Sequence, residues 1–231
     1  MYDSFEEDDG AGDEDSRVIV FGTRRNLEIL FKCIMWFLDG TLKTAPHIFM
    51  QIFTILGLVV RSGADAEDPD TAVALPLVFA LLPSKMEVHY TLVLQKVREA
   101  AERFRIRATS GPTKIMTDFE LGIINAARAV FPEAVIRLCF FHLGQSSYRK
   151  VQHIGLQEQY NDPEDRSIKN AVHSLLALAF LPADRVLDAF DGLERVSPPS
   201  HRPFVPVLRG DLPACEVEQL RGDARRRAPH Q

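Results

Sequence analysis

Two aspartates that follow apolar stretches of the chain are candidates for metal-dependent chemistry. Asp39 ends one such stretch and Asp118 ends another, 79 residues later. If the two stretches are neighbouring parallel strands, both carboxylates leave the sheet at one edge and repel each other unless a divalent cation lies between them. Such a pair can hold Mg²⁺, which neutralises a phosphodiester and polarises the attacking oxygen. The alternative is that each aspartate is a turn residue, since Asp-Gly is common at turns.

The segments around these aspartates predict an α/β fold with a mixed sheet. Apolar runs indicate five strands, at residues 31–38, 48–60, 73–82, 114–117 and 135–141. Short polar connections join the first three strands, as in an antiparallel meander, and Trp36 is expected in the core. Helical spacing of apolar residues then predicts helices at 87–107 and 121–130. Strand and helix alternate in this region, which implies a parallel section appended to the meander.

The C-terminal part of the sequence has a different character. From residue 142 onward the pattern is helical, with apolar-striped helices predicted at 168–180 and 183–193. Residues 197–231 contain six of the 14 prolines and three consecutive arginines without any periodicity. We therefore expect a disordered Pro/Arg-rich tail over 197–231.

Charge is distributed unevenly along the chain. Residues 3–15 carry eight acids and no base, so we expect residues 1–16 to be a disordered acidic tail. The other 24 acids stand against 27 Lys and Arg, which leaves the body weakly basic and neither demands nor forbids a nucleic-acid partner. Three separated cysteines fit a reducing compartment, and neither a secretory signal nor an apolar run of membrane-spanning length is present. We expect a soluble, intracellular protein that is not secreted and has no membrane partner.

Several motifs resemble those of the Mutator-like element (MULE) transposases. In chain order they are WFLDGTLK at 36–43, FMQ at 49–51, ALLPSK at 80–85 with Tyr90, TDFE at 117–120, CFFHLGQ at 139–145 and AFLP at 179–182. The resemblance runs from about residue 17 to residue 193. It implies a ribonuclease-H-like core with a DDE-type site, in which three acids hold Mg²⁺ or Mn²⁺ and cut DNA at transposon ends in the nucleus. By position, Asp39 would be the first acid and Asp118 the second.

The resemblance also predicts how the chain is divided. Residues 17–155 would form the ribonuclease-H-like core, a five-stranded mixed sheet with flanking helices, and 156–196 the start of an all-helical insertion. In the family the third acid is a glutamate that follows this insertion. The glutamates in this part of the chain lack the expected sequence context: Glu158, Glu164, Glu194, Glu216 and Glu218. We therefore expect a truncated transposase catalytic domain without its third acid; the alternative is a non-catalytic, domesticated or relic fragment that binds DNA or protein.

Three residues that follow Asp118 in the sequence have two interpretations each. His142 could face the acidic pair, as the resemblance suggests, or be a structural histidine. Glu120 could lie near the metal, although an exposed acid at a helix start is the favoured interpretation. Cys139 and His142 look like half of a zinc site, but no second pair of ligands has a suitable spacing. We expect no structural zinc and a packing role for Cys139.

Two further points concern partners and a rival enzyme class. Arg149 and Lys150 are candidate contacts to DNA phosphates, although a solvated helix face explains them as well. Asp-Gly-Thr also ends the nucleophile motif of haloacid-dehalogenase-like phosphatases, but the nucleophile position is occupied here by Phe37, which excludes that chemistry. The sequence leaves the oligomeric state open.

Overall fold

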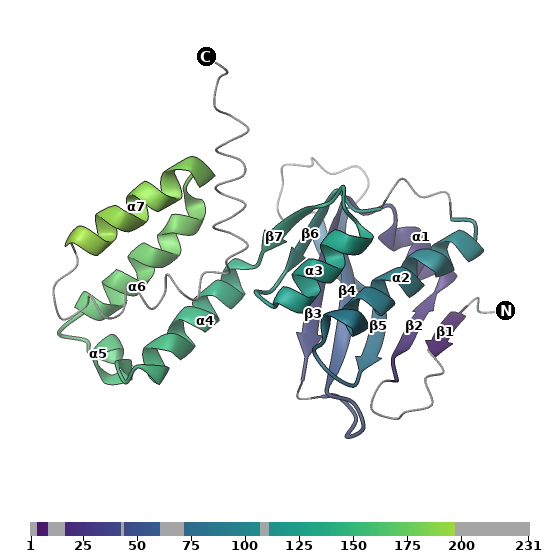
Figure 1. Cartoon of the computed structure of the whole chain (residues 1–231), viewed down its shortest axis with the longest axis horizontal. Coiled ribbons are helices and arrows are strands. Elements are labelled where there is room, and N and C mark those ends of the chain that lie inside the picture. The colour runs from purple at the N-terminus through teal and green to yellow at the C-terminus, as the bar shows by residue number, and fades with distance from the viewer. Residues whose placement is uncertain (1–3, 9–16, 43, 61–71, 107–110, 197–231) are drawn as a thin grey trace, which may run out of the picture. The chain divides into compact units, whose positions relative to one another are not determined.

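The computed structural model describes residues 4–8, 17–42, 44–60, 72–106 and 111–196 (Figure 1). The chain divides into two compact units, Met1–Cys139 and Phe140–Gln231. The boundary between these units follows Cys139. The expected division after residue 155, between the core and the helical insertion, stays a prediction. The C-terminal tail expected at 197–231 lies outside the described residues.

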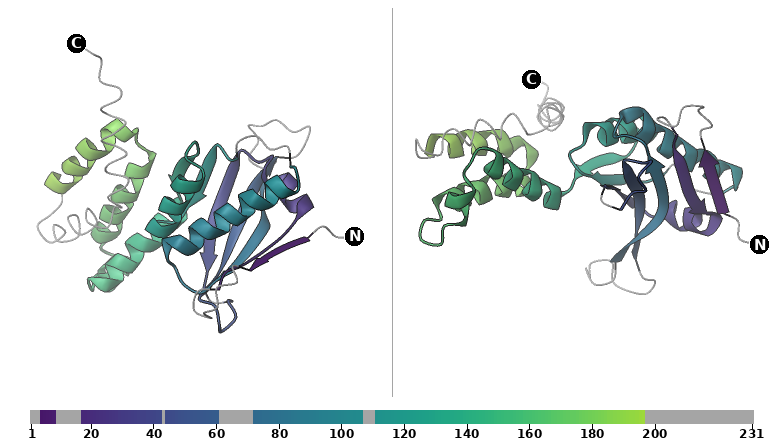
Figure 2. Two further views of the ribbon diagram at one scale, coloured as in Figure 1. Left: turned by 45° about the vertical axis from the view of Figure 1, so that its right-hand side comes forward. Right: turned by 90° about the horizontal axis from the view of Figure 1, so that it is seen from below.

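The first unit is built on a seven-stranded mixed sheet. Its strands are β1 (Ser4–Asp8), β2 (Ile19–Thr23), β3 (Met35–Thr41), β4 (Gln51–Val60), β5 (Ala72–Leu82), β6 (Lys114–Thr117) and β7 (Val135–Leu138). They lie side by side in the order β1-β2-β5-β4-β3-β6-β7 (Figure 2). The pairs from β1 to β3 are antiparallel, whereas β6 is parallel to β3 and β7 is parallel to β6. The predicted meander with an appended parallel section is therefore confirmed.

Two strands at the N-terminal side were not predicted. Strand β1 lies in the acidic segment expected to be disordered, and that expectation is wrong for residues 4–8. A reason is visible in its one buried aromatic residue: Phe5 keeps only 4% of its surface exposed, packs against Phe104 and covers Gly22 of β2. Burial of a phenylalanine ring stabilises the strand although its other residues are polar. Residues 9–16 lie outside the described residues.

Two predicted strands have different bounds in the structure. The strand expected at 31–38 begins at Met35, because helix α1 (Arg24–Leu30) and its last turn occupy the preceding residues. The strand expected at 135–141 ends at Leu138, because a helix begins at Phe140. Neither apolar run is a single strand, because one continues from a helix and the other into a helix. A short apolar run does not by itself separate these two states.

Helices α2 (Glu87–Arg103) and α3 (Leu121–Val130) pack against each other beside the sheet of the first unit (Figure 1). Helix α3 has the predicted bounds, and α2 ends four residues earlier than predicted. The core between the helices and the sheet contains Trp36, which is fully buried, as expected. Its ring lies edge-on to Phe131, at a centroid distance of 5.1 Å, and its Nε1–H donates to the carbonyl of Leu30 at 2.9 Å. The face of β3 that carries Trp36 and Leu38 is therefore the face that packs into the core.

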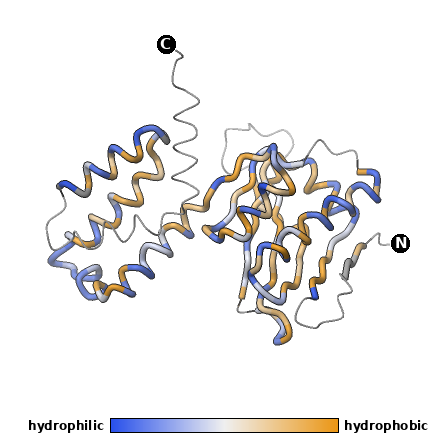
Figure 3. The backbone as a smooth tube through the Cα atoms, in the orientation of Figure 1, coloured by the Kyte–Doolittle hydropathy of each residue, from blue (hydrophilic) through white to orange (hydrophobic). Residues whose placement is uncertain are grey.

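The second unit is helical, as the sequence predicted. It contains α4 (Phe140–His153), α5 (Gln157–Asn161), α6 (Ser167–Ala177), a 3₁₀ turn (Leu178–Phe180) and α7 (Ala183–Val196). Hydrophobic residues recur along α4, α6 and α7 at helical spacing (Figure 3). Two small cores result, one around Val172 and one around Phe190. Within the described part of the chain, every helix is too short or too polar to cross a bilayer.

Candidate active site

The two candidate aspartates come from neighbouring parallel strands. Strands β3 and β6 pair in register up to Leu38 and Thr117, so Asp39 and Asp118 are the next residues of the two strands at the same edge. Leu38 and Thr117 are buried, whereas Asp39 and Asp118 are each half-buried. Side chains alternate between the faces of a strand, and therefore Asp39 lies on the face opposite to the core. The parallel pairing on which the metal hypothesis depends is confirmed; that the aspartates bind metal stays a prediction.

The backbone around the two aspartates differs. Asp39 lies inside β3, paired with Thr54 of β4, so it is not a turn residue although a glycine follows it. Asp118 lies just beyond β6, and its Oδ1 accepts a hydrogen bond from the backbone N–H of Glu120 at 3.0 Å. That contact is typical of an aspartate that fixes a turn. Asp118 therefore has a role in a turn, which does not decide whether it also binds metal, whereas Asp39 lies in a strand.

The side-chain amide of a buried residue explains why a glycine stands at position 40, next to Asp39. Gln51, the first residue of β4, has no exposed surface. A Cβ atom added to Gly40 would lie 2.5 Å from Gln51 Oε1, far closer than packing allows. The absence of a side chain at position 40 is therefore what gives the Gln51 amide its space.

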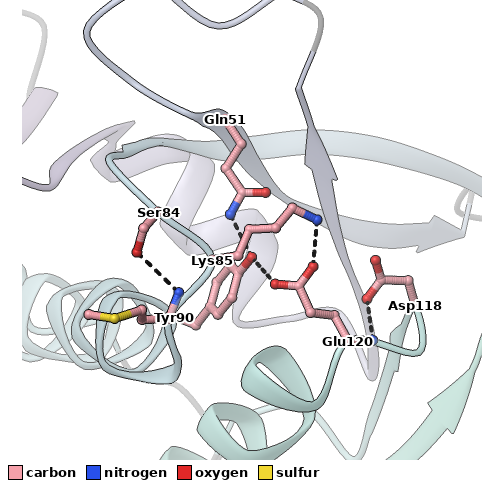
Figure 4. Close-up of polar contacts among 7 residues, drawn as sticks. Gln51, Ser84, Lys85, Tyr90, Asp118 and Glu120 are labelled. Carbon is pink, nitrogen blue, oxygen red and sulfur yellow. Dashed lines mark hydrogen bonds and ion pairs between the residues drawn. The ribbon is translucent and has the colours of Figure 1, made fainter.

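A hydrogen-bonded chain runs from this amide to the turn after β6 (Figure 4). Gln51 Nε2 donates to the hydroxyl of Tyr90 in α2 at 2.5 Å, and that hydroxyl donates to Glu120 Oε1 at 2.5 Å. Lys85 Nζ lies 2.7 Å from the other carboxylate oxygen of Glu120. We refer to Gln51, Tyr90, Glu120 and Lys85 as the Tyr90 network.

The environment of Tyr90 keeps its proton in place. Burial of the side chain, followed by the hydrogen bond to Glu120, raises the pKa of the phenol above its usual value. The hydroxyl therefore stays protonated at neutral pH and can donate to the Glu120 carboxylate.

Glu120 is not the exposed acid that was expected. It is the N-cap residue of α3, but its side chain keeps only 19% of its surface exposed. Tyr90 and Lys85 occupy its two oxygens, because ALLPSK and the start of α2 lie next to this turn. The sequence places Glu120 correctly at a helix start, but the partners that bury it lie 30 and 35 residues away in the sequence.

The other site candidates lie beyond β7. The backbone N–H of Cys139 donates to the carbonyl of Thr117 at 2.9 Å, and its side chain is half-buried. His142 lies in the first turn of α4, in the second unit, whereas the predicted strand at 135–141 would have placed it directly after a strand. Arg149 and Lys150 also lie in α4; Arg149 is exposed, with Nη2 at 3.5 Å from Gln145 Oε1, and Lys150 is half-buried.

The sequence did not predict Gln51 and Tyr90 as site residues, although Gln51 belongs to the FMQ motif and Tyr90 accompanies ALLPSK. A signal for Gln51 was present: it is a single amide in an otherwise apolar strand, and a buried polar group needs a hydrogen-bonding partner. Its partner lies on α2, 39 residues away, and no local pattern identifies it.

The donors at this edge suit a hydrated divalent cation. Carboxylate oxygens are preferred by Mg²⁺ and Mn²⁺, and Mg²⁺ commonly keeps several waters while binding one or two carboxylates. Asp39 and Asp118 provide two such groups. Over the described ranges, no group of three or more His, Cys, Asp or Glu residues is arranged to hold a metal ion. A cation held by these two aspartates would therefore take its remaining ligands from water or phosphate oxygens.

Comparison with known families agrees with the motifs. The family model of the MULE transposase domain matches residues 35–146, a range that starts at β3 and includes Asp39, Asp118 and the whole Tyr90 network. A search among curated proteins found no match. Residues 35–146 of this chain therefore correspond to a MULE transposase domain.

Proposed function

We propose that the domain acts in DNA transposition as the metal-binding part of a DDE-type active site on a ribonuclease-H-like core. The observation that supports this most is the parallel register of β3 and β6, which brings Asp39 and Asp118 to one edge of the sheet. The mixed sheet, an antiparallel meander extended by two parallel strands, is also the architecture that the resemblance implied. The substrate class is DNA, whose phosphodiesters the bound cation would approach.

The chain's own residues would hold the cation in two different ways. Asp39 is fixed by β4 and β6, which pair with β3 on either side. Asp118 is held by the hydrogen bond that its Oδ1 accepts from the backbone N–H of Glu120. When bound, a divalent cation there neutralises phosphate charge and polarises the attacking oxygen.

A second candidate function is binding of DNA or protein without cleavage. It is favoured by the arrangement of acids: within the described ranges, no third His, Cys, Asp or Glu joins the pair in a metal site. A two-metal cleavage reaction would lack part of its ligand set in such a site.

Mn²⁺ binding tests the proposed site directly. We expect Asp39→Asn and Asp118→Asn each to weaken Mn²⁺ binding about tenfold or more, because each removes a charged oxygen ligand. Electron paramagnetic resonance of free Mn²⁺ measures the affinity, and circular dichroism checks that the variants fold. The matched control is Asp188→Asn, an exposed aspartate of α7, which should leave the affinity unchanged. Equal affinities of the wild type and both site variants would refute the site.

Incubation with Mn²⁺ and DNA carrying transposon ends separates the two candidate functions. We expect this chain alone to bind Mn²⁺ without cutting the DNA. Cleavage that is lost in Asp39→Ala would contradict that expectation and assign the full catalytic function to the chain.

A further inference from the structure

We propose that Tyr90, together with Gln51, is a positioning residue that holds the turn carrying Asp118 in place relative to the strand carrying Asp39. The inference rests on the proposed metal site, because it assigns the Tyr90 network a role in the geometry of that site. It is carried by contacts between four segments that are far apart in the sequence.

The first step concerns the connection to Asp39. Gln51 lies within the space left open by Gly40, the residue that follows Asp39 in β3. Its amide is buried, and its Oε1 has no hydrogen-bond partner among the described residues. The contact with the Tyr90 hydroxyl is therefore the hydrogen bond that the Gln51 side chain makes here. A buried amide costs stability unless it is satisfied, so its position depends strongly on that hydroxyl.

The second step concerns Tyr90 itself. Its ring is fully buried and packs against Phe53 of β4, with 5.1 Å between the ring centroids. The core therefore fixes where the hydroxyl lies. That hydroxyl accepts from Gln51 and donates to Glu120, so one oxygen atom joins β4 to the turn between β6 and α3 (Figure 4).

The third step leads from Glu120 to Asp118. Tyr90 and Lys85 hold the two carboxylate oxygens of Glu120, and the backbone N–H of Glu120 holds Asp118 Oδ1. A residue anchored through both its side chain and its backbone has little freedom to rotate, and the same restraint applies to the Asp118 carboxylate. Hydrogen bonds from three different segments to the Tyr90 hydroxyl and the Glu120 carboxylate favour one geometry of this turn.

Tyr90→Phe tests the proposal, because it removes the hydroxyl and keeps the ring. Two measurements are made on the full chain: hydrogen exchange of the Glu120 backbone amide without metal, and Mn²⁺ affinity at a temperature where the variant is folded. We expect about tenfold faster exchange at Glu120 and about tenfold weaker Mn²⁺ binding, the size of effect seen when groups that orient metal ligands are lost. The matched control is Tyr160→Phe, a tyrosine of α5 in the second unit, which should change neither.

The outcomes separate positioning from simple packing. A lower melting temperature with unchanged Glu120 exchange and unchanged Mn²⁺ affinity would overturn the proposal. If the wild type binds no Mn²⁺, the proposed function fails, and exchange at Glu120 alone decides the positioning role: faster exchange in Tyr90→Phe supports it and equal exchange overturns it. Should Tyr90→Phe not fold, Gln51→Met, which removes the donor to the same hydroxyl at similar volume, is measured in the same way with the same expected direction.

Discussion

At the level of single residues, Asp39 and Asp118 show how much of a side chain's role can be predicted from the residue type. Both aspartates follow apolar runs, and the sequence gives both a metal interpretation and a turn interpretation. Pairing with β4 decides that Asp39 lies in a strand, whereas a local hydrogen bond from Glu120 makes Asp118 a turn residue. Only the second of these contacts is local in sequence, which is why residue patterns alone could not separate the two cases.

Gly40→Ala should lower the free energy of unfolding by about 1–3 kcal/mol, the usual cost of overfilling a packed site. The added methyl group would meet Gln51 Oε1, and the amide would have to leave its hydrogen bond with Tyr90. Urea denaturation followed by circular dichroism measures the change.

A double-mutant cycle is the control for this prediction. In a Gln51→Ala background the obstructing oxygen is absent, so Gly40→Ala should cost less than about 0.5 kcal/mol there. Equal costs in both backgrounds would show that some other contact requires the glycine.

The bounds of secondary-structure elements could be predicted where prolines, which interrupt helices and strands, flank a clear apolar pattern. Strand β6 and helix α3 have the predicted bounds, and prolines at 112 and 132 flank this segment. Helix α1 was missed because it has only seven residues, of which Leu27 and Leu30 are buried, too few for a periodic signal. Its start is nevertheless encoded locally, since Thr23 Oγ1 accepts from the backbone N–H of Asn26 at 3.1 Å.

Thr23→Ala should destabilise the first unit by about 1 kcal/mol, because it removes the N-cap acceptor of α1. Thr23→Ser keeps the hydroxyl and should stay close to the wild type. Thermal unfolding of the three proteins checks the order. If serine and alanine were equally destabilising, loss of the threonine methyl group rather than loss of the cap would be the cause.

At the scale of the whole molecule, the match to the MULE family covers only part of the sheet and of the helices. The match begins at β3, but β1 and β2 extend the same sheet, and the helices from α5 onward follow the matched range. The sequence predicted the mixed sheet and the helical C-terminal part. It missed the two N-terminal strands because β2 is short and β1 lies in a segment whose composition is typical of disorder.

DNA binding by the whole chain should be weak and sensitive to salt. Without the eight N-terminal acids, the 27 Lys and Arg exceed the acids only slightly, so we expect dissociation constants no tighter than about 1 µM near physiological salt. Fluorescence anisotropy with a labelled duplex between 50 and 200 mM NaCl measures this. Arg149→Gln should lower the slope of log affinity against log salt by about one if this side chain contacts a phosphate, whereas Arg185→Gln, another exposed arginine of the second unit, should not. Nanomolar binding that persists at high salt would contradict the prediction.

The outermost strands of the sheet have a consequence for how copies of this protein meet. Strand β1 has five residues, three of them acidic, and β7 at the other margin has only four. A strand of another molecule could add to the unpaired backbone N–H and C=O groups of such edge strands. Short or charged edge strands disfavour that addition. The acidic β1 strands of two molecules would also repel each other. We therefore expect the short, acidic strand β1 to disfavour edge-to-edge aggregation of this sheet.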